Sequence, residues 1–433
     1  MKRILSVFLL LCFYFSVNAQ SSTGYYSNVD KKVIEDFMDR RFGMFIHWGP
    51  VALKGTEIGW SRNKEVSKEE YDNLYKQFNP VLFDADAWVK TAKEAGMKYL
   101  TITAKHHDGF CLWPTKYTDY NIMNTPYKKD VVGALAKACK KYNIKFCIYY
   151  TVLDWYDTRY PLHNDGNKTP DSKADMPQFV QYMKDQLEEL IIGYHPYMIW
   201  FDGNWEQPWT YEYGKEVYDF IKKMDARIII NNRIGKGTHE VLDKKSIGDF
   251  ATPEQKIGRI DMLTPWESCI TLCQQWAWKP NDQMKSLQQC IQTIAKTAGG
   301  NGNLLFNIGP MPDGKMEDRQ LTRLLEIGSW MSKYGTSVYN TKGGPYQPSD
   351  VFASTRKGNK IFIHLFQRPS AELILLALQG ITVKKAYFLG GGHVGWRQER
   401  EHIALSLPEV LSDDNDTVIV LEVDKDVERL PLL

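Results

Sequence analysis

The 433-residue sequence lacks most of the motifs by which enzymes hold metals, phosphates or acyl intermediates. It has no CxxC pair and neither HxH nor HExxH spacing, which are common signs of zinc sites. It also has no GxSxG elbow for a serine hydrolase and no glycine-rich phosphate loop after its first predicted strand. The sequence therefore predicts no metal and no organic cofactor.

Charge of one sign is also missing, because the net charge is +2 and no block of like charge occurs. Binding to nucleic acid or to an anionic membrane is therefore not expected. The one long apolar run follows Lys2 and Arg3 and ends at a small-residue site before Gln20. It is short for a membrane span of ~20 residues, so we predict a cleaved signal peptide at residues 1–19. The mature protein is expected to be periplasmic or secreted, or lysosomal in a eukaryote, with no membrane attachment.

Cysteine is scarce, whereas aromatic residues are plentiful. Apart from Cys12 in the predicted signal, six cysteines are spread through the chain, several of them in apolar segments. Such a pattern is typical of buried free thiols rather than of a disulfide scaffold. Aromatic residues make up 13% of the chain, with 13 Trp and 24 Tyr. This share gives mild support to sugar binding, although a large core explains the same number.

Strand-like and helix-like segments alternate from residue 41 to residue 335. The strand-like segments are continuously apolar, as strands buried on both faces should be. Seven or eight such βα units predict an α/β fold, a TIM-type (β/α)8-like barrel, rather than an open doubly wound sheet. The predicted strands are residues 41–49, 97–109, 144–151, 197–203, 227–233 and 303–310, and the predicted helices are residues 83–96, 131–143, 176–192, 213–225, 284–300 and 317–335.

Composition changes at residues 340–350, where Gly, Pro and Ser cluster as in a linker. Beyond this point the apolar residues alternate in short runs, which predicts an antiparallel β-sandwich. We therefore expect a (β/α)8-like catalytic domain at residues 20–343 and a C-terminal β-sandwich domain at residues 344–433.

Polar and aromatic side chains follow almost every predicted barrel strand. Barrel enzymes keep their catalytic groups at the carboxyl ends of the strands, so these side chains are expected on one rim. Asp202 ends the apolar run "MIWFD", where both a turn-forming role and a chemical role are open, and Gly203 is expected to leave room for a ligand. Glu254 in "TPEQ" and Glu267 in "PWES" lie on later loops. Glycoside hydrolysis needs two carboxylates that flank one bond, and these residues are the candidates.

Seven motifs occur in a fixed order between about residue 40 and residue 313: FGMFIHWG, KHHDGFCLWPTKYTDYN, YMIWFDGNW, NNR, TPEQ, PWESC and GGNGNLLFNIGP. With these motifs the chain resembles the α-L-fucosidases of glycoside hydrolase family 29, and KHHDGFxLW is the most specific of them. The resemblance implies a retaining, exo-acting hydrolase without a metal. Such an enzyme removes terminal α-L-fucose from oligosaccharides or glycoconjugates through a covalent glycosyl-enzyme.

Motif positions carry the implied roles onto this sequence. The resemblance implies Asp202 as the nucleophile and Glu254 as the general acid/base, with Glu267 as the alternative acid/base. Trp60 and Trp276 are expected to face the 6-methyl group of fucose. The residues expected to bind the sugar are His47, Trp60, His106, His107, Tyr149, Trp200, Arg233, Glu267 and Trp276.

The segment after the first strand departs from the family pattern. Some members carry Glu-Trp-Tyr there, whereas this chain has Gly59 before Trp60, so a sugar contact is not assigned to Glu57. Three other readings stay open: a catalytically silent fucose-binding protein, a metal-dependent barrel hydrolase, and carbohydrate binding by the C-terminal domain. The sequence does not determine the oligomeric state. It also does not separate broad specificity from restriction to α-1,3/1,4 linkages.

Overall fold

The computed structural model describes residues 24–166 and 170–433. The predicted signal peptide at residues 1–19 lies outside the described residues. Among the helices of the described ranges, none is long and apolar enough to cross a bilayer.

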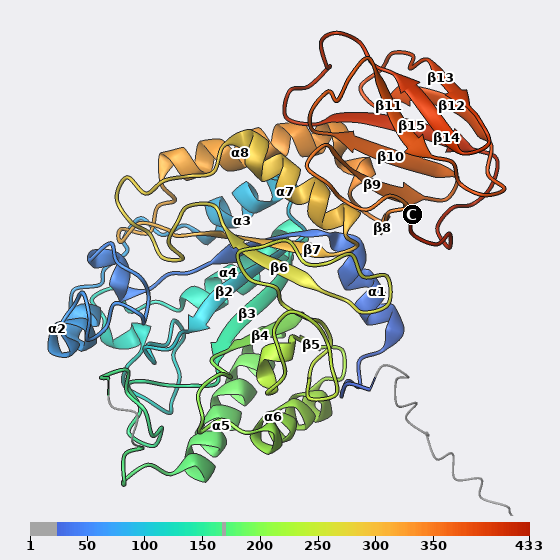
Figure 1. Ribbon diagram of the computed structural model, residues 1–433. Coiled ribbons are helices and arrows are strands. Elements are labelled where there is room, and N and C mark those ends of the chain that lie inside the picture. The colour runs from blue at the N-terminus through green and yellow to red at the C-terminus, as the bar shows by residue number, and fades with distance from the viewer. Residues whose placement is uncertain (1–23, 167–169) are drawn as a thin grey trace, which may run out of the picture.

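A parallel sheet of seven strands forms the centre of the larger domain, in the order β5-β4-β3-β2-β1-β7-β6 (Figure 1). Every ladder in this sheet is parallel, as the alternating βα pattern predicts. The strands are β1 (Phe42–Ile46), β2 (Tyr99–Lys105), β3 (Lys145–Thr151), β4 (Met198–Asp202), β5 (Ile229–Ile230), β6 (Glu267–Thr271) and β7 (Asn303–Ile308).

Residues 249–255 close this sheet into a ring. Asn231, directly after β5, pairs with Phe250, and Ala251 pairs with Trp266, directly before β6; both bridges are parallel. In chain order, this segment therefore takes the place of the eighth barrel strand, between the edge strands β5 and β6. The predicted (β/α)8-like barrel is confirmed, with one irregular strand position at residues 249–255.

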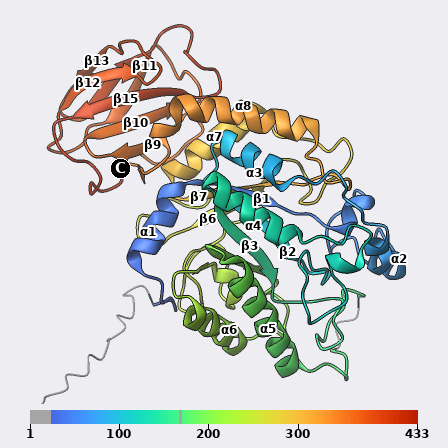
Figure 2. The same cartoon turned by 180° about the vertical axis from the view of Figure 1, so that it is seen from behind.

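Six helices cover the outside of the barrel, and all six were predicted. Figure 2 shows α3 to α6 along the outer side of the strands. The side chains of Asp84, Asp130, Asp175 and Thr210 cap the first turns of α3 to α6, which fixes where these helices begin. The helices are α3 (Ala85–Glu94), α4 (Val131–Tyr142), α5 (Met176–Tyr194), α6 (Tyr211–Met224), α7 (Leu287–Gly299) and α8 (Asp318–Tyr334).

The shorter elements were not predicted. They are α1 (Lys31–Arg40), α2 (Lys68–Asn73) and the 3-10 turns η1 (Pro50–Leu53), η2 (Leu74–Lys76), η3 (Ile122–Asn124), η4 (Asn232–Ile234) and η5 (Gly335–Ser337). Helix α1 covers the amino-terminal end of the barrel, where the ring of Phe37 packs on Tyr99 and Phe250 at centroid distances of 5.7 and 4.8 Å. The carboxyl ends of the strands are thus left as the open end.

The C-terminal domain consists of two antiparallel sheets, in the orders β12-β15-β10-β9-β8 and β11-β14-β13. An apolar core that includes Ile361, Leu375, Leu405 and Leu421 joins the two sheets, so the predicted β-sandwich is confirmed. The strands are β8 (Lys342–Gly343), β9 (Phe352–Lys357), β10 (Lys360–Leu365), β11 (Glu372–Leu376), β12 (Val383–Phe388), β13 (Trp396–Gln398), β14 (His402–Ser406) and β15 (Thr417–Val423).

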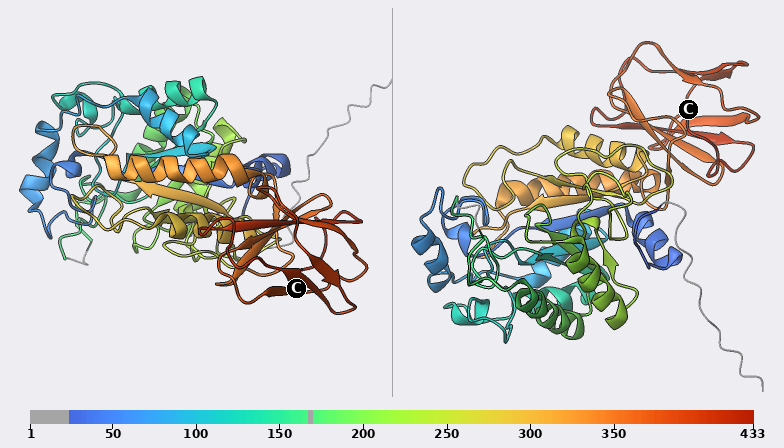
Figure 3. Two further views of the ribbon diagram at one scale, coloured as in Figure 1. Left: turned by 90° about the horizontal axis from the view of Figure 1, so that it is seen from above. Right: turned by 60° about the horizontal axis from the view of Figure 1, so that its bottom comes forward.

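The five-stranded sheet packs against the barrel through its other face. Phe362 and Val420, paired across β10 and β15, belong to the same apolar cluster as Trp330 and Tyr334 of α8. Both views in Figure 3 show this domain to one side of the barrel, beside α8. It is therefore joined to the barrel by a shared core and not only by the chain.

Candidate active site

A cavity of about 270 Å³ opens at the carboxyl ends of the barrel strands. Nine of the eleven residues that the sequence singled out line it, and His107 and Glu267 do not. The lining residues are Phe45, His47, Trp60, His106, Tyr149, Trp200, Asp202, Trp205, Arg233, His239, Glu254, Cys269 and Trp276.

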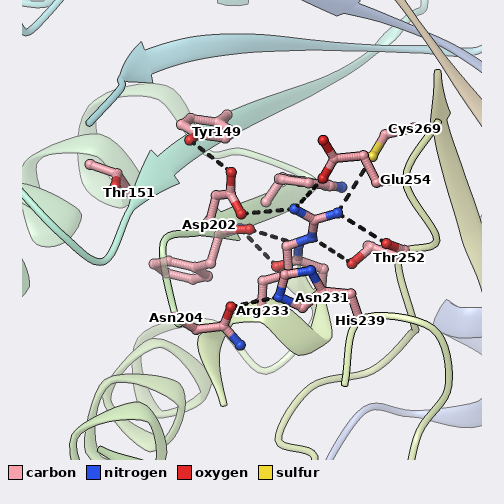
Figure 4. A network of polar contacts seen from close by, with 12 residues as sticks. Tyr149, Thr151, Asp202, Asn204, Asn231, Arg233, His239, Thr252, Glu254 and Cys269 are labelled. Carbon is pink, nitrogen blue, oxygen red and sulfur yellow. Dashed lines mark hydrogen bonds and ion pairs between the residues drawn. The ribbon is translucent and has the colours of Figure 1, made fainter. Parts of the chain in front are cut away.

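Arg233 connects the two principal carboxylates. Its Nη1 lies 2.9 Å from Oδ1 of Asp202 and 2.8 Å from Oε2 of Glu254 (Figure 4). The two oxygens can be no farther apart than these two distances laid end to end. That limit is shorter than the ~6.5–9.5 Å between carboxyl groups in inverting glycosidases, and it fits the ~5–5.5 Å of retaining ones.

Arg233 is itself held on three sides. Its Nε donates to Oγ1 of Thr252 at 2.9 Å, and its Nη2 donates to the carbonyl oxygen of Thr252 at 3.1 Å. Its guanidinium carbon lies 4.8 Å from the ring centroid of Trp200. The barrel-closing segment 249–255 therefore supplies Glu254 and also the Thr252 contacts that position Arg233.

Asp202 is the last residue of β4, and the structure favours its ionised form. Burial alone raises the pKa of this carboxyl, but the Arg233 guanidinium and His107 outweigh burial and hold the pKa well below its ordinary value. Tyr149 donates its hydroxyl to Oδ2 at 3.3 Å. His107 Nε2 lies 3.6 Å from Oδ2, which is beyond hydrogen-bond length. Asp202 is thus a rigid, ionised carboxylate that faces the cavity.

The backbone conformation at position 203 explains why this residue is glycine. Its φ is +100°, and a Cβ there would lie 2.8 Å from the side chain of Leu153. The turn after Asp202 requires glycine because of this backbone conformation and this neighbour. That Gly203 also makes room for a ligand stays a prediction.

The cavity histidines are held in their neutral form. Burial lowers the pKa of His47 to about 3, against its hydrogen bond to Asn307, and it lowers the pKa of His106 well below its ordinary value. Asn307 Nδ2 donates to the carbonyl oxygen of Trp276, so its Oδ1 accepts from His47 Nδ1 at 2.7 Å. His47 Nε2 is then a free-pair acceptor, which suits a ligand hydroxyl.

Aromatic rings form the outer wall of the cavity. Trp60 and Trp205 stack at a centroid distance of 5.9 Å with an interplanar angle of 20°, and both rings are partly exposed. Trp276 lies deeper, with its ring 4.8 Å from that of His47. Backbone N–H groups of Trp276 and Ala277 donate to the Glu57 carboxylate at 2.9 and 3.0 Å, so Glu57 anchors this loop.

Glu267 lies beneath the cavity floor. It is completely buried at the start of β6, where it accepts hydrogen bonds from Tyr99 and from Trp200 Nε1. Burial raises its pKa to about 8, against these two hydrogen bonds. Trp200 therefore stands between Glu267 and the cavity, and this carboxyl does not reach the space that Asp202 and Glu254 share.

Four lining residues were missed by the sequence analysis. Phe45 and Trp205 lie beside predicted positions, at the end of the first strand and three residues after Asp202, so their placement could have been inferred. Cys269 projects from β6, a strand that was not predicted. His239 lies in the loop after β5 and carries no local signal; its Nε2 is 2.7 Å from Asn204 Oδ1.

Comparison with known proteins gives a consistent result. A family model described as alpha-L-fucosidase matches residues 13–336. The structure of alpha-L-fucosidase isoenzyme 1 from Paenibacillus thiaminolyticus is similar, with a TM-score of 0.83 and 32% identity over 91% of this chain and 99% of that chain.

Two further relatives agree. An alpha-L-fucosidase of Bacteroides thetaiotaomicron has a TM-score of 0.84 and 30% identity over 93% of this chain and 98% of that chain. The tissue alpha-L-fucosidase of Homo sapiens is 26% identical over 86% of this chain and 85% of that protein. A barrel whose open end brings two carboxylates onto one arginine, and a family match that spans most of the chain, lead to one conclusion: this chain belongs to the α-L-fucosidase family.

Proposed function

We propose that this protein is a retaining, exo-acting α-L-fucosidase in which Asp202 is the nucleophile and Glu254 the general acid/base. One observation carries the proposal: both carboxylates contact the same Arg233 nitrogen, which brings one oxygen of each as close together as a retaining pair requires. A solved relative, an alpha-L-fucosidase from Bacteroides thetaiotaomicron described as a trapped covalent intermediate with 2-fluoro-fucosyl fluoride, supports the same chemistry.

In the first step, Asp202 attacks the anomeric carbon and forms a glycosyl ester while the bond to the leaving oxygen breaks. Glu254 transfers its proton to that oxygen, so that the aglycone leaves as a neutral alcohol. In the second step, Glu254 takes a proton from water, which attacks the same carbon and displaces Asp202. Two inversions leave the released fucose in the α configuration.

The two carboxyl groups differ in their surroundings. Asp202 stays ionised because Arg233 and His107 stabilise its charge. Glu254 is more exposed, at 40% of its side chain against 13% for Asp202, and so it can reach both a leaving oxygen and water.

Sugar recognition uses neutral acceptors and aromatic rings. His47 and His106, held neutral by burial, exchange hydrogen bonds with fucose hydroxyls. Trp60 and Trp276 face the 6-methyl group. Fixed polar partners discriminate strongly, because a sugar without the matching hydroxyl leaves buried groups unpaired.

The substrate is a fucosylated oligosaccharide or glycoconjugate, and the mature enzyme is exported. The apolar N-terminal run with its cleavage site supports export. Among the similar proteins is a plasma alpha-L-fucosidase of Pongo abelii, 26% identical over 89% of this chain.

Substitution of Asp202 tests the proposal. Asp202→Asn should lose aryl α-L-fucoside turnover by several orders of magnitude, whereas Asp350→Asn, on an exposed loop, should keep it. Asp202→Gly with added azide should release β-L-fucosyl azide, because azide then attacks from the side vacated by the carboxylate. In the wild type, NMR should detect α-L-fucose first. Initial release of the β anomer, or full activity of Asp202→Asn, contradicts the assignment.

A further inference from the structure

A second cavity, of about 310 Å³, lies at the same end of the barrel as the first. Gln255, one of its lining residues, directly follows Glu254, and Thr271, another, is the last residue of β6. The lining residues are Gln255, Thr271, Cys273, Gln274, Gln283, Met284, Lys285 and Gln289.

The chemistry of this lining suits sugar hydroxyls. Four of its residues are glutamines, and each carboxamide offers two N–H donors and an oxygen with two lone pairs. Gln274 and Gln283 are joined by one hydrogen bond of 2.9 Å, which uses a fraction of that capacity. A ligand with alternating donors and acceptors, as on a sugar ring, is matched by such a surface, and an apolar ligand is not.

The cavity is preorganised by several contacts. Gln255 has φ of +54°, which is uncommon for a residue other than glycine, and its side chain bonds with Oγ1 of Thr271 at 3.2 Å. Asp282 accepts the backbone N–H groups of Gln274 and Gln275, both at 2.9 Å, and thereby fixes the loop after β6. A ligand therefore meets groups that are already in place, which lowers the entropic cost of binding.

The direction of bond cleavage leads from the first cavity to the second. As the general acid, Glu254 must face the glycosidic oxygen, so the aglycone begins at Glu254. Cys269 lines the first cavity and Thr271 the second, and two residues of a strand span about 7 Å. The backbone N–H of Gln255 donates to the carbonyl oxygen of Cys269 at 2.9 Å, which ties a residue lining the second cavity to one lining the first.

We propose that the second cavity binds the sugar to which fucose is attached, through Gln274, Gln283 and the neighbouring carboxamides. This inference rests on the proposed role of Glu254. It makes the enzyme selective for fucose on an oligosaccharide, because a simple aryl fucoside has no hydroxyl groups to place among the glutamines.

The double variant Gln274→Ala/Gln283→Ala tests the inference. Two substrates are compared: 4-nitrophenyl α-L-fucoside, and the best substrate of a panel of α-1,2-, α-1,3- and α-1,4-fucosylated trisaccharides. For the trisaccharide, kcat/KM should fall about tenfold, mainly through KM, because two hydrogen bonds of ordinary strength are lost. For the aryl fucoside it should stay within about twofold. Gln367→Ala, an exposed glutamine of the C-terminal domain, is the matched control and should change neither.

Equal losses on both substrates, or an unchanged trisaccharide rate, overturn the inference while the proposed function stands. A wild-type protein that hydrolyses neither the aryl fucoside nor any trisaccharide of the panel overturns the proposed function and the inference with it. Thermal unfolding of the double variant checks its fold, and an unchanged midpoint is expected because both side chains are exposed.

Discussion

At the scale of single residues, the position of Arg233 separates two glutamates that look equivalent in the sequence. Glu254 contacts the same nitrogen as Asp202, whereas Glu267 is enclosed by Tyr99 and Trp200 under the cavity floor. A group that exchanges protons with a leaving oxygen and with water must reach both. Glu254 does so from the rim, and Glu267 is completely buried.

This difference predicts how two variants respond to the leaving group. Glu254→Ala should slow natural fucosides by about 10²–10⁴-fold and activated phenyl fucosides far less, because a good leaving group departs without a proton. Azide should restore its deglycosylation step. Glu267→Gln should lower both substrates by similar factors. Steady-state rates across a series of phenyl leaving groups give the comparison, and leaving-group dependence with azide rescue in Glu267→Gln alone would exchange the two roles.

Much of the site was predictable because it follows buried strands. Asp202, His47 and Tyr149 each stand at or near the end of a continuous apolar run, and the alternation of elements places such ends on one rim. The motif resemblance added the roles. His239 was not predictable, because it reaches the cavity from an irregular loop whose path depends on tertiary contacts. The burial of Glu267 was also hidden, because its partners Tyr99 and Trp200 come from distant strands.

At the scale of secondary-structure elements, the barrel-closing segment 249–255 is the part that the sequence analysis interpreted as a loop. It holds several polar residues and Pro253 and pairs through isolated bridges, so neither apolar periodicity nor length indicates a strand. Strand β6 was missed as well, because its five buried residues include Glu267 and Thr271. These irregular elements nevertheless carry Glu254 and the support of Arg233.

Thr252 of this segment should control the position of the Arg233 side chain. Its hydroxyl accepts from Arg233 Nε at 2.9 Å and donates to Asn232 Oδ1 at 3.0 Å. Thr252→Val keeps the shape and leaves both partners unpaired, so the free energy of unfolding should fall by about 1–3 kcal/mol. The displaced Arg233 should lower kcat/KM by about 10- to 100-fold. Thr252→Ser retains the hydroxyl and should restore activity; if it is as impaired as Thr252→Val, the hydroxyl is not the cause.

Glu267 joins β6 to β2 and β4 across the barrel interior, and its protonation should make stability depend on pH. Its pKa is raised from 4.5 to about 8 in the fold, so the native state holds a proton that the unfolded chain releases. This contribution is fully present below the unfolded pKa and is lost as pH rises toward 8. Thermal midpoints measured from pH 5 to pH 8 should therefore fall less steeply for Glu267→Gln than for the wild type. Parallel slopes would contradict the raised pKa.

At the scale of the whole molecule, both the barrel and the sandwich were predictable, because each follows from a repeated pattern along the chain. Their joint core was not. In β10, Ile361 and Ile363 face the sandwich interior, whereas Phe362 faces the other way and joins the core of the barrel helices. A strand that is apolar on both faces indicates that both faces are covered, but it does not indicate which partner covers each face.

This joint core predicts that the barrel and the C-terminal domain unfold together. Phe362→Ala removes a large, 5% exposed side chain from the cluster that includes Trp330 and Tyr334 of α8. The free energy of unfolding should therefore fall by about 3–5 kcal/mol. The matched control Ile374→Ala, on the outer face of β11 with 53% exposure, should change it by less than about 0.5 kcal/mol. Calorimetry of the full chain should show a single transition, and in Phe362→Ala this whole transition should move to lower temperature. The kcat of the folded enzyme should stay unchanged, because the sheet lies on the outside of α8 whereas the catalytic carboxylates lie at the open end of the barrel. Two separate transitions, of which only one shifts, would mean that the domains are independent and that their contact contributes little to stability.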